Sequence, residues 1–214
     1  MVNSPEQRLR ITFGKVGSQK YIGHLDLAKT WERILRRAEI ALSYSQGFKA
    51  RPKMQLAAAL PLGITSECEL IDVWLDFALP VEGLAEHLMA VSPPGLPIHH
   101  ITEVPIKSPA LQSLCVSAIY VMTPLEAVDV SVLKDRAQVL MAQPEVLRVR
   151  RDKPYDLRPL VLSLEINEQG QIRTEMVLRE QAAGRPDELT DALGIKANEF
   201  AVHRQQIRLR EIAD

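Results

Sequence analysis

Basic and aromatic side chains gather in two neighbouring segments near the start of the chain, residues 24–37 and 44–53. Lys and Arg side chains at this density can pair with the phosphates of a nucleic acid or with an acidic protein surface. Tyr44 and Phe48 lie among them, and an aromatic ring can stack on an unpaired base. These residue types predict a binding surface, although a solvated helix face explains the charges equally well.

A helix is the element expected to position the first segment. Apolar residues recur there at helical spacing, which predicts an amphipathic helix beginning near Gly23 or His24. Asp26 falls in the first turn, where the helix dipole favours an acid, and within reach of Lys29. The expected buried residues are Leu27, Trp31, Ile34, Leu35 and Ala38. The expected exposed cations are Lys29, Arg33, Arg36 and Arg37.

The second segment follows the helix closely. Gln46, Gly47 and Pro52 interrupt regular structure, so Lys49, Arg51 and Lys53 are expected on a loop or at a strand start near the helix end. Residues 1–60 hold 11 Lys and Arg against 4 Asp and Glu, whereas the remainder holds 15 against 23. The overall net charge of −1 therefore hides a local basic surface.

The order of elements predicts an α+β fold with mainly antiparallel sheets. Strands are expected at 9–13, 54–60, 70–77 and 98–104, with helices at 24–38 and 81–90. The second half repeats this plan with an extra strand near 146–151. Such an order is typical of ferredoxin-like, split βαβ lobes. Prolines between the halves predict two domains, residues 1–107 and 112–214.

The remaining polar residues carry few catalytic signatures. The sequence has no phosphate-binding glycine loop, dinucleotide fingerprint, nucleophile elbow or HExxH motif. Cys68 and Cys115 are isolated and the histidines are scattered, so no metal and no cofactor are expected. His24 near Tyr44 can serve as a general base at a phosphodiester, although a histidine at a helix start more often serves structure.

A second basic strip is expected around Arg148, Arg150, Arg151, Lys153 and Arg158, partly neutralised by Asp152 and Asp156. Apolar runs are too short to span a membrane, and the N-terminus lacks the layout of a secretory signal. We therefore expect a cytoplasmic protein that does not enter a membrane. The sequence carries no signal for an oligomeric state.

Several motifs together resemble a domain family of unknown function that is associated with radical-SAM proteins. The matching segments are 9–13, 21–27, 36–38, 44–48, 60–63, 156–159 and 185–186. The family pattern has proline where this chain has Ala50. The resemblance implies that family members are fused to radical-SAM proteins or encoded beside them, and that they are encoded near ribonuclease E/G. The resemblance thereby implies an RNA-related setting, such as tRNA or rRNA modification, without establishing an activity. Two lone cysteines cannot hold a radical-SAM cluster, so at most an accessory role is implied.

Three hypotheses follow. The first is a non-catalytic module that binds tRNA or rRNA and presents it to a radical-SAM or ribonuclease partner. Its expected contacts are Lys29, Arg33, Arg36, Arg37, Tyr44, Gln46, Phe48, Lys49, Arg51, Lys53 and Arg158. The second is a metal-independent endoribonuclease of ferredoxin-like type that uses His24 and Tyr44. The third is a protein-binding adaptor for a radical-SAM enzyme.

Overall fold

The computed structural model describes residues 5–46, 48–150, 152–196 and 198–211, and these form two compact units. The first unit comprises Met1–Leu114 with Arg210–Asp214, and the second comprises Cys115–Leu209. Both units are mixed α+β, and the strands within each unit pair antiparallel, as the sequence predicts. The division into domains 1–107 and 112–214 stays a prediction. No helix in the described part of the chain is long and apolar enough to cross a membrane.

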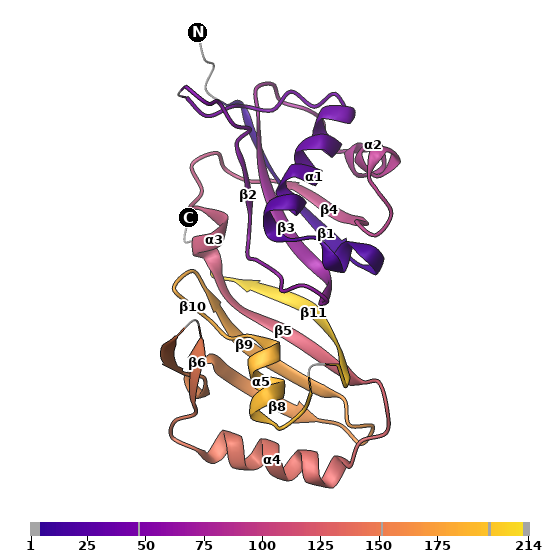
Figure 1. Cartoon of the computed structure of the whole chain (residues 1–214). Coiled ribbons are helices and arrows are strands. Elements are labelled where there is room, and N and C mark those ends of the chain that lie inside the picture. The colour runs from indigo at the N-terminus through magenta and orange to yellow at the C-terminus, as the bar shows by residue number, and fades with distance from the viewer. Residues whose placement is uncertain (1–4, 47, 151, 197, 212–214) are drawn as a thin grey trace. The chain divides into compact units, whose positions relative to one another are not determined.

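The first unit places two longer helices against one face of a four-stranded antiparallel sheet (Figure 1). The strands lie in the order β2, β3, β1, β4. In the central pair, Ile11 of β1 faces Ile71 of β3. The elements of this unit are β1 (Gln7–Lys15), the 3-10 helix η1 (Gly17–Tyr21), α1 (His24–Arg37), β2 (Met54–Leu56), β3 (Thr65–Leu75), α2 (Leu84–Val91), β4 (Ile98–Glu103) and α3 (Leu111–Leu114).

One continuous apolar core holds the first unit together. Leu9, Ile11 and Phe13 of β1 pack with Trp31 of α1 and Leu88 of α2, and all five are buried. The alternation along β1 predicts this buried face correctly. The opposite face is not simply solvated, however, because Arg8 is also buried.

A buried ion pair explains the position of Arg8. Its guanidinium donates two hydrogen bonds to the Asp72 carboxylate, of 3.0 and 2.6 Å, and packs on the ring of Trp74. Arg10 donates two further hydrogen bonds to the same carboxylate. The second face of the sheet is therefore a charged, buried layer that the alternating pattern does not reveal.

The second unit repeats the strand order of the first. Its strands lie in the order β8, β9, β5, β11, with β10 paired to the end of β9 and a separate hairpin of β6 and β7. The elements are β5 (Cys115–Pro124), α4 (Val130–Ala142), β6 (Leu147–Arg150), β7 (Lys153–Asp156), the 3-10 helix η2 (Arg158–Leu160), β8 (Val161–Ile166), β9 (Ile172–Arg179), β10 (Ala182–Ala183), α5 (Pro186–Ala192) and β11 (Phe200–Leu209).

Candidate nucleic-acid interface

Helix α1 has the two faces that its sequence predicts. Leu27, Trp31, Ile34 and Leu35 are buried, and the Trp31 ring meets Phe13 edge-on at a centroid distance of 4.7 Å. The helix begins at His24 after an N-cap at Gly23, and Ala38 at its C-terminal end is buried as well. Burial of four large apolar side chains fixes the rotation of the helix, so its opposite face is held toward solvent.

The exposed face of α1 carries a partly compensated row of cations. Lys29 pairs with Asp26 at 3.3 Å, and Arg36 pairs with Glu32 at 2.6 Å. Both pairs are largely exposed, where such pairs contribute only about 0–1 kcal/mol, so an anionic ligand can displace them at little cost. Arg33 and Arg37 are exposed and make no ion pair with any residue that the structure describes. The face is therefore a net cationic surface.

The loop that follows α1 has a closed neck and an exposed tip. Tyr44 and Pro52 form a backbone bridge, and the Ser45 N–H donates to the Arg51 carbonyl at 2.8 Å. The Arg51 N–H in turn donates to Ser45 Oγ at 3.0 Å. These contacts hold the two ends of the loop together at Tyr44 and Ser45 on one side and Arg51 and Pro52 on the other. Gly47, at the predicted turn, lies outside the described residues.

The tip of this loop presents an unprotected aromatic ring. The exposed fraction of Phe48 is 106%, so its side chain contacts almost nothing in the protein. Lys49, Ala50 and Arg51 are also exposed, as is Gln46 before it. Tyr44, at the neck, is only 40% exposed. Tyr44 thus helps to close the loop, whereas Phe48 is free to contact a partner.

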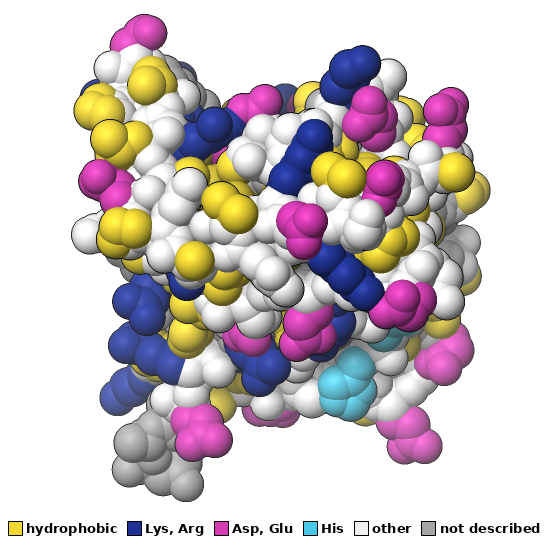
Figure 2. Space-filling view, turned by 90° about the horizontal axis from the view of Figure 1, so that it is seen from below, with side chains coloured by type: hydrophobic (Ala, Val, Ile, Leu, Met, Phe, Trp, Pro, Cys, Tyr) yellow, Lys and Arg dark blue, Asp and Glu magenta, His cyan; other side chains and the backbone are white. Residues whose placement is uncertain are grey.

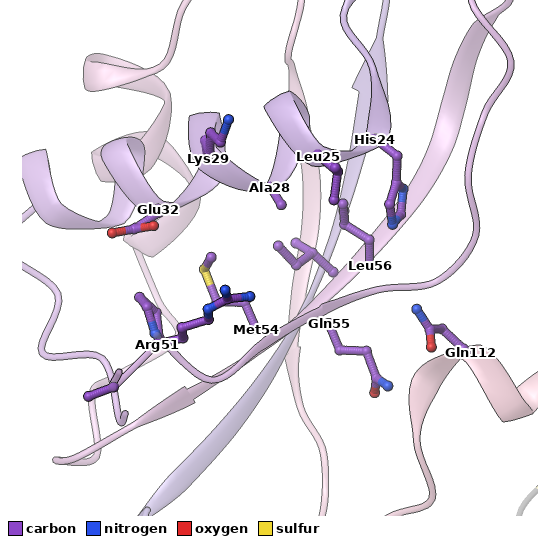
Figure 3. A pocket seen from close by; sticks show the side chains of 13 residues that line it. His24, Leu25, Ala28, Lys29, Glu32, Arg51, Met54, Gln55, Leu56 and Gln112 are labelled. Carbon is purple, nitrogen blue, oxygen red and sulfur yellow. The ribbon is translucent and has the colours of Figure 1, made fainter. Parts of the chain in front are cut away.

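A cavity of about 730 Å³ lies between α1 and the chain segment that leads into β2 (Figure 3). His24 and Lys29 line it from the helix, and Arg51 lines it from the opposite wall. The two basic segments predicted from the sequence therefore meet here. Among the predicted contacts on described residues, Arg33, Arg36, Arg37, Tyr44, Gln46, Phe48 and Lys49 do not line this cavity.

Lys53 borders a neighbouring cavity instead. This second cavity has a volume of about 570 Å³ and is lined by Arg8, Arg51, Lys53 and Trp74, among others. Arg51 thus borders both cavities. The pairing of His24 with Tyr44 that a nuclease would use is not seen in the lining of either cavity, within the described residues.

The other predicted RNA contact, Arg158, has a structural role in the second unit. Its guanidinium donates to the backbone carbonyls of Met141, at 3.1 Å, and Val161, at 3.0 Å. Arg148 of the same basic strip pairs with Asp191, while Arg151 lies outside the described residues. Much of this strip is therefore engaged within the protein. Figure 2 shows basic, acidic and apolar side chains mixed over much of the face that it draws, with several Lys and Arg side chains together along its left side.

One titratable group beside this strip is strongly perturbed. Burial raises the pKa of Tyr155 to about 12, and the negative charge of Glu188 acts in the same direction. The phenol therefore stays protonated at neutral pH, which makes it unsuitable as a base. Among the described residues, no group of three or more His, Cys, Asp or Glu side chains is placed to hold a metal ion.

Sequence reasoning missed the side chains that complete the cavity beside α1. Leu25, Met54 and Gln112 line it, and Gln55 fixes one of its walls. Leu25 alone carried a signal in the sequence, because this leucine in the first turn falls outside the predicted buried stripe; in the structure it is 75% exposed. The others come from separate segments, and nothing in their local spacing brings them together.

Comparison with known proteins gives a family but no activity. A search among curated proteins finds no match to this chain. The sequence model of one family matches residues 8–186, which is most of both units and includes α1 and the loop that follows it. The chain therefore belongs to the family described as "Uncharacterized protein conserved in bacteria (DUF2344)".

Proposed function

We propose that this protein is an accessory RNA-binding module for tRNA or rRNA, with α1 and the 44–53 loop as its binding surface. The observation that carries the proposal is the fully exposed Phe48 at the tip of a loop with a closed neck, beside Lys49 and Arg51. An unprotected aromatic ring next to cations is what stacking on a base and pairing with phosphate require.

The charges on α1 extend this surface. Arg33 and Arg37 are exposed cations without an ion-pair partner among the described residues, and Lys29 and Arg36 hold only surface partners. Phosphate contacts of this kind supply affinity and orientation without reading a base sequence. Selectivity for one RNA would then come from Phe48 and from the shape of the RNA.

The partner that we propose is a radical-SAM enzyme or a ribonuclease in the cytoplasm, in keeping with the family resemblance of the sequence. The cluster of a radical-SAM enzyme would belong to that partner, because this chain has two cysteines. We also propose that both units are variants of the split βαβ, ferredoxin-like arrangement. The order β2, β3, β1, β4 in one unit and β8, β9, β5, β11 in the other supports this.

The test is a salt titration of RNA affinity with matched charge reversals. Arg33→Glu with Arg37→Glu removes two cations from α1, and Arg173→Glu with Arg179→Glu makes the same change at exposed positions of the second unit. Affinity for tRNA and rRNA fragments is measured by fluorescence anisotropy across a range of salt concentrations. The α1 variant should lose affinity and show a log–log slope shallower by roughly 1.4 to 1.8, at 0.7 to 0.9 for each lost contact.

The control variant should retain the affinity and slope of the wild type. An equal loss in both variants would mean that net charge, and not α1, governs binding. Absence of salt-dependent RNA binding in the wild type would refute the proposal and favour the adaptor hypothesis. Specific cleavage of tRNA in EDTA that disappears in His24→Ala would favour the endoribonuclease hypothesis.

A further inference from the structure

We propose that the cavity between α1 and β2 holds one unstacked nucleotide of the bound RNA. This inference rests on the proposed function and names the RNA feature that the module selects. The cavity volume of about 730 Å³ lies within the range of small-molecule sites, which is roughly 300–1,000 Å³. Its walls come from α1, from the segment that contains β2, and from α3.

The cavity is apolar in the middle and polar at both ends (Figure 3). Leu25, Ala28 and Leu56 lie at its centre, Arg51 and Glu32 lie toward one end, and Gln112 lies at the other. A nucleobase has the same distribution, since its faces are apolar and its edges carry donors and acceptors. Enzymes that take a base out of a helix hold it in this way, between apolar side chains and with polar groups at its edge.

Three of the polar side chains suit particular parts of a nucleotide. The Arg51 guanidinium can pair with a phosphate or stack on the base, and Met54 beside it offers a polarizable sulfur to an aromatic ring. The Gln112 amide provides both a donor and an acceptor for a base edge. The Glu32 carboxylate accepts hydrogen bonds, which gives it a use with a base amino group but none with a fatty acid or a simple anion.

Hydrogen bonds within the first unit fix the wall that carries Gln112. The N–H of Leu111, at the start of α3, donates to Gln55 Oε1 of β2 at 2.8 Å. Arg8 donates to the carbonyls of Ser108 at 2.6 Å and Pro109 at 2.9 Å, just before α3. The segment that the prolines mark as a linker is therefore fastened to the sheet. A wall held in this way is preorganised, which lowers the entropic cost of binding.

The consequence is a preference for RNA with an extrahelical base. A base paired within a duplex cannot enter the cavity, whereas a bulged or single-stranded base can enter without loss of pairing. Stacking of one base on an aromatic ring is worth roughly 5- to 150-fold in affinity, and we take the same order of magnitude for a base held in this cavity. We expect this factor between a hairpin with a single-nucleotide bulge and the same hairpin without it.

The experiment compares these two RNA hairpins, which have nearly equal numbers of phosphates, by fluorescence anisotropy at one salt concentration. Ala28→Trp fills the centre of the cavity and should bring the bulged-to-paired affinity ratio close to 1 while affinity for the paired hairpin persists. Ala90→Trp is the matched control, because Ala90 is exposed on α2 and lines neither described cavity. The ratio of the control should equal that of the wild type.

A second variant protects the test against misfolding of Ala28→Trp. Leu25→Gln changes a side chain that is 75% exposed, so the core is untouched, and it should lower the ratio in the same direction by a smaller factor. Strong salt-dependent binding of both hairpins with a wild-type ratio near 1, or a ratio unchanged in both cavity variants, would overturn this inference and leave the proposed function standing. Absence of salt-dependent binding to either hairpin would overturn both.

Discussion

Replacing Asp72 with alanine is predicted to destabilise the first unit by about 3–5 kcal/mol, the usual cost of removing one partner from a buried ion pair. The side chains of Arg8 and Asp72 are 1% and 0% exposed. The Asp72 carboxylate accepts four hydrogen bonds, two from Arg8 and two from Arg10. Without it, the Arg8 guanidinium remains buried with no counter-ion among the described residues, and keeps its hydrogen bonds to two backbone carbonyls and its packing on Trp74.

Urea unfolding followed by tryptophan fluorescence measures this effect in the first unit alone. Both tryptophans, Trp31 and Trp74, belong to that unit, and the Arg8 guanidinium lies 4.5 Å from the ring of Trp74. The matched control is Asp76→Ala, because the Asp76 carboxylate accepts one hydrogen bond from Ser43 Oγ at 2.6 Å. The free energy of unfolding of the control should fall by about 1 kcal/mol. A loss below about 1 kcal/mol for Asp72→Ala, with an unchanged denaturant slope, would refute the reasoning.

Three further predictions concern single side chains. Phe48→Ala should leave thermal stability unchanged because Phe48 is fully exposed, but should weaken RNA binding roughly 5- to 150-fold; equal affinities would exclude stacking. The Asp129 carboxylate caps α4, and its hydrogen bond with Ser131 helps to lower its pKa below the ordinary value of 3.8. The ionised carboxylate therefore stabilises the fold above pH 3.8, and this stabilisation is lost as the pH falls through the lowered pKa. The thermal midpoint of Asp129→Ala should therefore lie below the wild type at neutral pH and converge with it in acid. Gly170→Ala should lower the free energy of unfolding by more than about 1 kcal/mol, as measured by denaturation followed by circular dichroism. The reason is that φ at this position is +74° and the new Cβ would lie 2.4 Å from Val128 Cγ2.

Local periodicity was sufficient to predict α1 and its two faces. The apolar spacing of Leu27, Trp31 and Ile34 depends only on neighbours along the helix, and the packing of Phe13 against Trp31 agrees with it. The order of the longer strands and helices in both units was predictable for the same reason, whereas the short elements α3, β7 and β10 were not. Strand boundaries were less predictable: the expected strand at 54–60 ends at Leu56, although the Ala57 N–H still donates to the Leu70 carbonyl at 2.9 Å in the same register.

Contacts between distant segments were not predictable from one sequence. Arg8 meets Asp72 across 64 positions, and Gln55 meets Leu111 across 56, so no local pattern marks either pair. The prolines at 105 and 109 suggested a linker, yet these long-range bonds fix the residues around them and create the α3 wall of the cavity. The β7 strand was also missed, since it is short and contains Pro154, which usually argues against a strand.

The central claim is that RNA contacts α1 and the loop that follows it, and photo-crosslinking tests this most directly. Wild-type protein is irradiated with tRNA and rRNA fragments that carry 4-thiouridine, and the crosslinked peptides are identified by mass spectrometry. The account predicts crosslinks within residues 24–37 and 44–53, with Phe48 among the modified residues, and their loss at high salt. Crosslinks confined to the second unit, or none above the level of an unrelated acidic protein, would contradict it.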